Sequence, residues 1–179
     1  MNIEYEVRIL EIDKEEIIKK LEELGAKKVG YFEQKRYVYD VIPKKDDEWI
    51  RLRTNGEKTT LTYKNVVKTT IDGTNELEIV VEDFEKTNEL LEKIGIFNRG
   101  YQENTRLQYI LDGVEIDIDS WPMIPTYLEI EGKNESEVIA MIEKLNVEKD
   151  KITTLDVQSI YEEVYNIDIT NCLELKLKN

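Results

Sequence analysis

Residues 48–65 read EWIRLRTNGEKTTLTYKN, and this stretch decides the fold. Asn55-Gly56 is a strong signal for a two-residue hairpin turn, and residues alternate in character on both sides of it. The turn predicts three opposed pairs: Arg53 with Lys58, Arg51 with Thr60, and Trp49 with Thr62. Counting further along the second strand places Lys64 on the same face as Arg51 and Arg53.

The same alternation continues outward along the chain, with ionisable residues on one face of strand after strand. These residues are Glu4, Glu6 and Arg8 in 2–10, Glu76 and Glu78 in 75–82, Arg106 in 101–111, Asp117 and Asp119 after a second turn at Asp112-Gly113, and Glu129 and Glu131 in 126–132. The second turn predicts two further opposed pairs, which are Gln108 with Asp117 and Arg106 with Asp119. Residues 28–40 form a further, tyrosine-rich strand.

A single Glu-x-Glu pair on a strand is usually a solvated face, but three such pairs and one Asp-x-Asp pair fall on separate strands here. Opposite charges paired across strands stabilise a sheet by only about 0.2–1 kcal/mol each. This stabilisation is too small to explain why so many carboxylates are crowded on one face. A metal ion and an anionic ligand explain the crowding better. A sheet closed into a barrel would turn this charged face inward around a polar channel.

Helical periodicity predicts three helices, at 13–24, 84–94 and 135–146. We therefore expect an α+β protein, a closed eight-stranded antiparallel β-barrel whose apolar outer face the helices cover. The chain is expected to form one domain over 1–179, with its core at about 2–146. Residues 148–179, with a possible helix at 155–165 and a last strand near 173–177, should pack on the barrel or seal one mouth.

Composition narrows the chemistry of any site. The chain has 179 residues and a net charge of −14, which argues against a nucleic-acid groove or an anionic membrane surface as partner. It has no histidine and a single cysteine, Cys172, so histidine-based catalysis, histidine-ligated zinc and cysteine-rich metal sites are excluded. Any metal must be held by carboxylates, which suit Mg²⁺, Mn²⁺ or Ca²⁺. No signal peptide or membrane-spanning run is recognisable, and we expect a cytoplasmic protein.

Four segments together carry a family resemblance. MNIEYEVRIL (1–10), EWIRLRTNGEKTTLTYKN (48–65), NELEIVVEDFEKTNELLEKIG (75–95) and GVEIDIDSWPMIPTYLEIEG (113–132) resemble, in order, the conserved segments of the CYTH superfamily. This superfamily contains class IV adenylate cyclases and thiamine triphosphatases, and the details are most similar to the bacterial cyclase-like branch. The resemblance implies an eight-stranded triphosphate tunnel, two divalent metal positions and a possible homodimer.

The resemblance also implies a role for each charged position. The implied phosphate-binding residues are Arg8, Arg51, Arg53, Lys64 and Arg106. The implied metal-side carboxylates are Glu4, Glu6, Asp119, Glu129 and Glu131. Further tunnel-lining residues are expected to be Glu76, Glu78, Asp117, Lys58 and Lys35.

Two departures from the family pattern bear on activity. Arg8 stands in place of a lysine, and Asn104 stands where a lysine is usual, which removes one phosphate contact. Asn104 shares a strand face with Arg106 and is expected to point into the tunnel, where a lysine would increase affinity for triphosphate.

Four functions remain open. A cyclase would convert ATP to cyclic AMP and pyrophosphate, which makes it a lyase. A triphosphatase, a hydrolase, would cleave thiamine triphosphate, inorganic triphosphate (tripolyphosphate) or a nucleoside triphosphate. A phosphate-binding protein with weak or lost turnover, or a barrel with a purely structural role, is the remaining alternative. The resemblance favours the cyclase.

Overall fold

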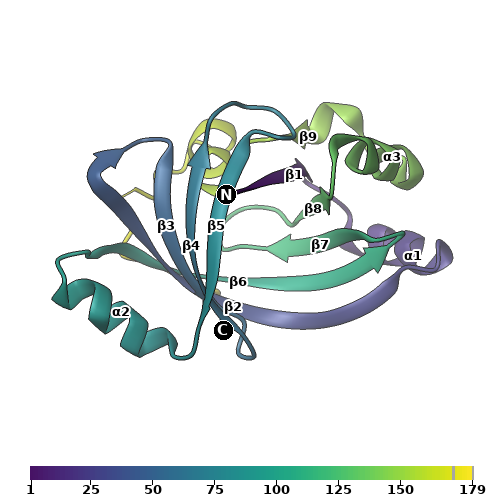
Figure 1. Ribbon diagram of the computed structural model, residues 1–179. Helices are drawn as coiled ribbons and strands as arrows, with labels where there is room; N and C mark the ends of the chain where they lie inside the picture. Colours follow the sequence, from purple (N-terminus) through teal and green to yellow (C-terminus); the bar gives the residue numbers. More distant parts are fainter. Residues whose placement is uncertain (171, 179) are drawn as a thin grey trace.

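The computed structural model describes residues 1–170 and 172–178 and confirms the closed eight-stranded antiparallel barrel (Figure 1). Around the barrel the strands follow the order β6-β2-β3-β4-β5-β1-β8-β7, and β7 pairs with β6 to close the sheet. The strands are β1 (Asn2–Ile9), β2 (Lys27–Lys45), β3 (Glu48–Thr54), β4 (Thr59–Val66), β5 (Thr74–Val81), β6 (Asn98–Leu111), β7 (Val114–Ser120) and β8 (Tyr127–Gly132). Closure turns one face of every strand toward a common interior.

The turn at Asp112-Gly113 sets the register that its sequence predicts. Arg106 lies opposite Asp119 and Gln108 lies opposite Asp117. Both turn residues have positive φ, at 54° and 85°, as a tight two-residue turn requires. Both predicted pairs are therefore confirmed.

The register predicted from Asn55-Gly56 is wrong by two residues. Thr54 lies opposite Thr59, so the loop holds four residues rather than two. The Asn55 side chain accepts hydrogen bonds from the backbone N–H groups of Glu57 and Lys58, at 3.0 and 2.8 Å, and this extends the turn.

A shift of two residues exchanges pairing partners but keeps each side chain on its face. Arg51 lies opposite Thr62, Arg53 opposite Thr60, and Trp49 opposite Lys64. The predicted shared face of Lys64, Arg51 and Arg53 is therefore confirmed, although the individual pairs are not.

The three predicted helices are present outside the barrel. They are α1 (Lys14–Glu23), α2 (Phe84–Lys93) and α3 (Glu135–Leu145). Asp13, Asp83 and Asn134 cap their first turns by accepting hydrogen bonds from backbone N–H groups. In Figure 1, α1 and α3 lie at the right end of the barrel and α2 lies at the lower left.

The helices cover only part of the apolar outer face. Leu21 of α1 and Val138 of α3 pack with the outward residues of β1, β6, β7 and β8, while Leu91 of α2 packs on Tyr39 and Leu52. Leu77 and Ile79 of β5 remain 56% and 54% exposed. The expectation that the helices cover the whole outer face is wrong, because none of the three lies over β5.

Residues 149–170 and 172–178 form short elements, and the helix expected at 155–165 and the strand expected near 173–177 are both present in shortened form. The elements are a 3₁₀ turn (Lys149–Lys151), β9 (Ile152–Thr153), α4 (Val157–Ser159), a π-helical turn (Ile160–Val164) and β10 (Glu174–Leu175). Ile160 and Tyr161 are fully buried against Trp121 and Tyr127. Arg8 Nη1 donates to the Leu155 carbonyl at 2.9 Å, so this segment packs against one mouth of the barrel, as expected.

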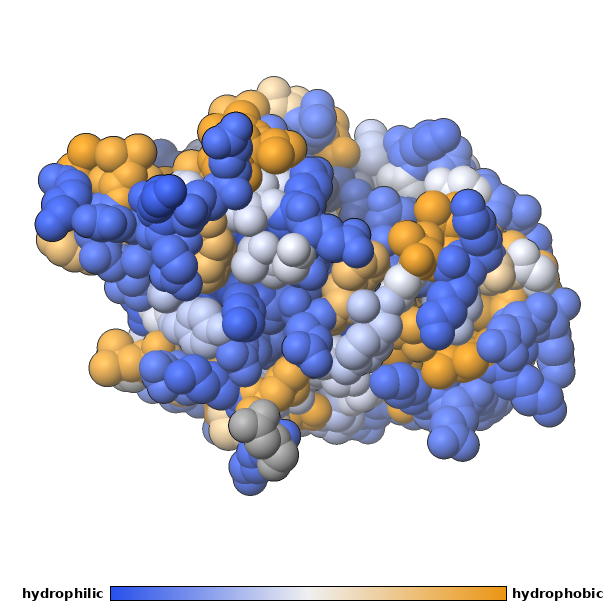
Figure 2. Space-filling view, turned by 90° about the horizontal axis from the view of Figure 1, so that it is seen from below, coloured by the Kyte–Doolittle hydropathy of each residue, from blue (hydrophilic) through white to orange (hydrophobic). Residues whose placement is uncertain are grey.

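The outer surface reflects the charge of the chain. The face seen from below in Figure 2 is mainly hydrophilic, with apolar side chains in separate patches. Among the described residues, no helix is long and apolar enough to cross a membrane.

Candidate functional site

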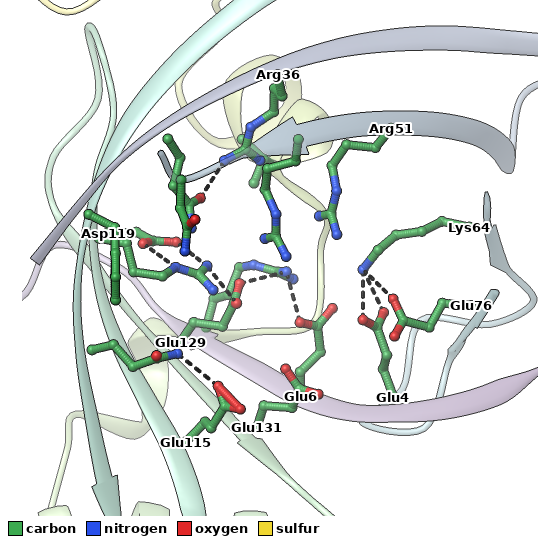
Figure 3. Close-up of a pocket in the computed structure, with 18 of the residues that line it drawn as sticks. Glu4, Glu6, Arg36, Arg51, Lys64, Glu76, Glu115, Asp119, Glu129 and Glu131 are labelled. Atoms are coloured by element: carbon green, nitrogen blue, oxygen red, sulfur yellow. Dashed lines mark hydrogen bonds and ion pairs between the residues drawn. The ribbon is translucent and has the colours of Figure 1, made fainter. Parts of the chain in front are cut away.

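The barrel encloses a cavity of about 280 Å³ whose wall is almost entirely polar. Thirteen of the charged residues singled out in the sequence line it: Glu4, Glu6, Arg8, Arg51, Arg53, Lys58, Lys64, Glu76, Glu78, Arg106, Asp119, Glu129 and Glu131. They come from seven strands and the loop after β3, and Figure 3 shows several of them pointing toward one another. Strand alternation combined with closure brings them together.

Two predicted lining residues lie elsewhere. Asp117 faces the interior but is buried beneath Arg106, whose Nη1 lies 2.5 Å from Asp117 Oδ2. Lys35 is exposed, whereas its neighbours Gln34 and Arg36 line the cavity. The expectation for Lys35 is therefore wrong, because adjacent residues on a strand point to opposite faces.

Arg106 is the centre of the most buried part of the network. Its Nε and Nη2 donate to the two carboxylate oxygens of Asp119, at 2.8 and 2.6 Å, and Nη2 also lies 2.9 Å from Glu129 Oε1. Burial alone would raise the pKa of Glu129, but the guanidinium groups of Arg8 and Arg106 hold it well below its usual range. Glu129 is therefore ionised and held by cations.

Arg8 and Lys64 hold the carboxylates of β1 and β8. Arg8 Nη2 lies 3.0 Å from Glu6 Oε2 and 2.8 Å from Glu129 Oε2. Lys64 Nζ donates to both oxygens of Glu4, at 2.8 and 2.6 Å, and lies 3.9 Å from Glu76 Oε2. Figure 3 shows these contacts as dashed lines.

Glu131 differs from the neighbouring Glu4, Glu6 and Glu129 because, within residues 1–170 and 172–178, it forms no ion pair. Burial raises the pKa of Glu131 to about 8, and repulsion from Glu129 and Glu6 adds to the effect. Burial likewise raises the pKa of Asp117 to about 7. A cation beside Glu131 would relieve this repulsion.

The acidic residues supply the carboxylate oxygens that a divalent metal prefers, but their side chains are not arranged around a common point. Hard divalent cations take carboxylate oxygens, and repulsion from Glu6 and Glu4 helps to raise the pKa of Glu131, as repulsion from Glu4 helps to raise that of Glu6. Within the part of the chain that the structure describes, no three such side chains converge on one point as they stand. Metal binding would therefore draw on carboxylates that now bind Arg8 and Lys64.

Sequence reasoning missed several residues of the cavity wall. They include Phe32, Gln34 and Arg36 of β2, Glu115 of β7, and the aromatic residues Trp121 and Tyr127. Glu115 could have been found, because it shares the face of Asp117 and Asp119. Which face of β2 turns inward was not evident, since Lys35 and Arg36 offer a cation on each.

Asn104 faces the interior as expected, but it does not reach the cavity. Its side chain is fully buried, and its Oδ1 accepts a hydrogen bond from Arg36 Nη2. A lysine here would place an ammonium group against a buried guanidinium. We therefore no longer expect Asn104→Lys to increase triphosphate affinity, because Arg36 already supplies a cation beside this position.

A second cavity, of about 370 Å³, adjoins the first. Glu6, Arg8, Arg36, Arg51 and Lys64 line both. The wall of the second cavity is half apolar and includes Val38, Trp49 and Ile169, together with polar residues of the C-terminal segment such as Ser159 and Thr170. The charged tunnel thus opens into a space that differs from it in character.

Comparison with known proteins agrees with this geometry. The family model of the CYTH domain matches residues 2–157. The chain belongs to the CYTH family. The resemblance drawn from the four sequence segments is thereby confirmed.

Individual CYTH relatives extend the comparison. A Methanocaldococcus jannaschii protein named "Putative adenylate cyclase MJ0240" is 27% identical over 163 residues, which are 84% of this chain and 93% of that protein. The solved structure of the PH1012 protein from Pyrococcus horikoshii is 25% identical with a TM-score of 0.75, over 86% of this chain and 96% of that one.

A Hippeastrum protein has the same fold at lower identity. It is an adenylyl cyclase candidate that has a dominant triphosphatase activity. It is 16% identical with a TM-score of 0.59, over 93% of this chain and 97% of that one. Among the proteins compared, the CYTH fold is thus named for both cyclase and triphosphatase chemistry.

Proposed function

We propose that this CYTH protein is a divalent-metal-dependent enzyme that binds a triphosphate in its tunnel and converts ATP to cyclic AMP and pyrophosphate. One observation carries the proposal. An enclosed, charged tunnel that suits a triphosphate opens into a second, half-apolar cavity of about 370 Å³, which has room for a nucleoside. The relative named for an adenylate cyclase supports the same reaction.

Arg51 and Arg53 are the first residues to bind phosphate oxygens in this proposal. Neither forms an ion pair with a carboxylate of the described residues, so both guanidinium groups are free to bind. Arginine presents a planar array of N–H groups that matches two phosphate oxygens at once. Lys64, between Glu4 and Glu76, contacts the same phosphate chain from β4.

Arg8 and Arg106 have a more restricted role. Each is tied to carboxylates, so each reaches phosphate only through N–H groups that remain free. Their main effect is to hold Glu129 ionised between them.

The metal-side residues are Glu4, Glu6, Glu129, Glu131 and Asp119. A divalent ion held there would supply positive charge to the phosphate oxygens and so stabilise the charge that develops on them. In the cyclase reaction the ribose 3′-hydroxyl attacks the α-phosphorus and releases its proton to solvent, and pyrophosphate leaves with the electrons of the broken P–O bond. The tunnel residues hold the β- and γ-phosphates in line for that departure.

Triphosphate hydrolysis is the second candidate, because the tunnel chemistry is the same if water attacks the terminal phosphorus instead. The Hippeastrum relative indicates that this fold carries such an activity in another protein. Binding without turnover is the third outcome.

Product analysis separates these functions. The purified protein is incubated with ATP, thiamine triphosphate or tripolyphosphate, each with Mg²⁺ or Mn²⁺, and cyclic AMP, pyrophosphate and phosphate are measured. We expect cyclic AMP from ATP, and Arg51→Gln should lower the rate on the order of 100-fold. Lys35→Gln, which removes a positive charge from the outer face, should change it little. Phosphate without cyclic AMP would replace cyclase by triphosphatase, and no product from any substrate would refute the proposal.

The metal is tested separately by thermal denaturation. Millimolar Mg²⁺ or Mn²⁺ should raise the melting temperature, since binding to the native state stabilises it by mass action. Glu131→Gln should reduce the shift, and Glu163→Gln, on the C-terminal segment, should not. Absence of a shift with either ion, with or without tripolyphosphate, would count against a metal site.

A further inference from the structure

The charged tunnel has two electrostatically different sides. On one side, Arg8 and Arg106 are neutralised by carboxylates at 2.5–3.0 Å. On the other side lie Arg36, Arg51 and Arg53, and none of them forms an ion pair among residues 1–170 and 172–178. In Figure 3 no dashed line reaches Arg51.

Arg36 is the most deeply placed of these three arginines. It is 6% exposed, and its guanidinium lies 4.4 Å from the centre of the Trp121 ring. Nη2 donates to Gln34 Oε1 at 2.9 Å and to Asn104 Oδ1. The buried Nε has no hydrogen-bond partner among the described residues.

The contacts of Arg36 orient its charge without cancelling it. Gln34 and Asn104 accept hydrogen bonds through neutral amide oxygens, and the Trp121 ring attracts the cation without carrying a net negative charge. A buried arginine with a structural role normally has a carboxylate partner, because an unpaired buried charge is costly. Gln34 and Asn104 have the shape of such partners but not the charge.

The neighbouring arginines make this cost larger. Burial, together with repulsion from Arg51 and Arg53, holds the pKa of Arg36 well below its usual range. Repulsion from Arg51, together with burial, lowers the pKa of Arg53 to about 10. Three like charges held together in a buried wall require an anion to compensate them.

We propose that Arg36 is an anion-binding residue of this chain, which completes a three-guanidinium site with Arg51 and Arg53 and holds one phosphate group. Arg36 and Arg51 line both cavities, so this phosphate lies where the charged tunnel meets the second cavity. The identity of the anion as part of a triphosphate rests on the proposed function. The three-guanidinium site itself rests on the burial, contacts and unpaired charges of Arg36, Arg51 and Arg53.

The test measures binding of tripolyphosphate and of pyrophosphate by calorimetry, with excess Mg²⁺ in every sample. Arg36→Gln should weaken tripolyphosphate binding on the order of 10- to 100-fold, which is the range for a hydrogen bond to a charged group. Arg36→Lys should lose less, because it keeps the charge. Lys35→Gln removes the same charge from the adjacent residue on the outer face. The affinity of the Lys35→Gln protein for tripolyphosphate should stay within about twofold of wild type.

A second measurement distinguishes anion binding from a structural role. If the charge of Arg36 stays uncompensated until an anion binds, the Arg36→Gln substitution removes an unpaired buried charge. The ligand-free Arg36→Gln protein should then melt no lower than the wild type. Asn104→Asp gives Arg36 a carboxylate, so it should raise the ligand-free melting temperature and weaken tripolyphosphate binding. A structural arginine predicts the opposite result for Arg36→Gln.

Each outcome decides between the ideas. Tripolyphosphate binding that Arg51→Gln abolishes but Arg36→Gln leaves unchanged overturns the role of Arg36 and leaves the proposed function standing. An Arg36→Gln protein that melts lower, or fails to fold, also overturns it. Loss of anion binding in Arg36→Gln, in a protein whose wild type turns over no triphosphate, supports the site and refutes the proposed function. Failure of the wild type to bind either anion overturns both.

Discussion

Replacing Arg106 by glutamine removes the cation on which three buried carboxylates converge. Arg106 lies within 2.5–2.9 Å of oxygens of Asp117, Asp119 and Glu129, whose side chains are 4%, 0% and 8% exposed. Glutamine is shorter and neutral, so it cannot hold the three groups. We expect Arg106→Gln to be strongly destabilising.

The magnitude follows from the burial of these partners. Breaking a buried ion pair by removing one member costs about 3–5 kcal/mol, because the other charge stays behind. For a domain of this size, each kcal/mol lowers the melting temperature by about 2–4 °C. The expected fall is therefore about 6–20 °C. Protonation limits the cost, since burial already raises the pKa of Asp117 to about 7.

The assay is thermal denaturation of both proteins from pH 5 to pH 8. In the wild type, Glu129 has a lowered pKa, so its stabilising effect is present throughout this pH range and is lost only as the pH falls below the ordinary glutamate value of 4.5. In Arg106→Gln the remaining carboxylates bind protons more readily in the folded state than in the unfolded state, so acid stabilises this variant. The difference between the two proteins should narrow toward pH 5.

Arg99→Gln is the matched control. Arg99 pairs with Asp40 at 3.2 Å, but the two side chains are 27% and 33% exposed, so the loss should stay below about 1 kcal/mol. Equal losses in both variants, or a deficit of Arg106→Gln that grows toward acidic pH, would refute the reasoning.

Three further outcomes are expected. Because the pKa of Glu131 is about 8 in the folded protein, the folded state keeps a proton that the unfolded chain has already released. The stability of the ligand-free protein should therefore fall as the pH rises from about 5 to 8. The slope is at most about 1.4 kcal/mol per pH unit, and it is smaller here because Glu131 is partly exposed. Thermal denaturation of Glu131→Gln should show a flatter profile, and an unchanged profile would contradict the assignment. Tyr161→Ala should cost about 3–5 kcal/mol in urea denaturation, because the ring is fully buried, whereas the more exposed Tyr165→Ala should cost less than half of that. Asn104→Lys should lower the melting temperature through repulsion from the buried Arg36, with a cost on the order of 2 kcal/mol or more. A variant that is more stable and binds tripolyphosphate more tightly would contradict this reasoning and support a lysine contact to phosphate at this position.

The sequence by itself determined the kind of barrel and most of its inner face. Alternation has a period of two, so the inward side of β1, β3 and β7 follows from parity once one charged residue is known to face inward. That inference survived an incorrect register at Asn55-Gly56, because a shift of two residues preserves parity. The turn at Asp112-Gly113 also gave its register, since both of its residues take the positive φ that a two-residue hairpin turn requires.

Only the tertiary structure decided how the charges are used. Lys35 and Arg36 are adjacent cations on one strand, and closure of the barrel, not any local preference, turned Arg36 inward. Ion pairs such as those of Arg106 join β6, β7 and β8, whose spacing depends on the whole sheet. The C-terminal segment has little periodicity of its own, so its place against the tunnel mouth was set by packing on Trp121 and Tyr127. Local pattern fixes which face a side chain takes, whereas its partners come from strands far apart in the sequence and are set by closure of the barrel.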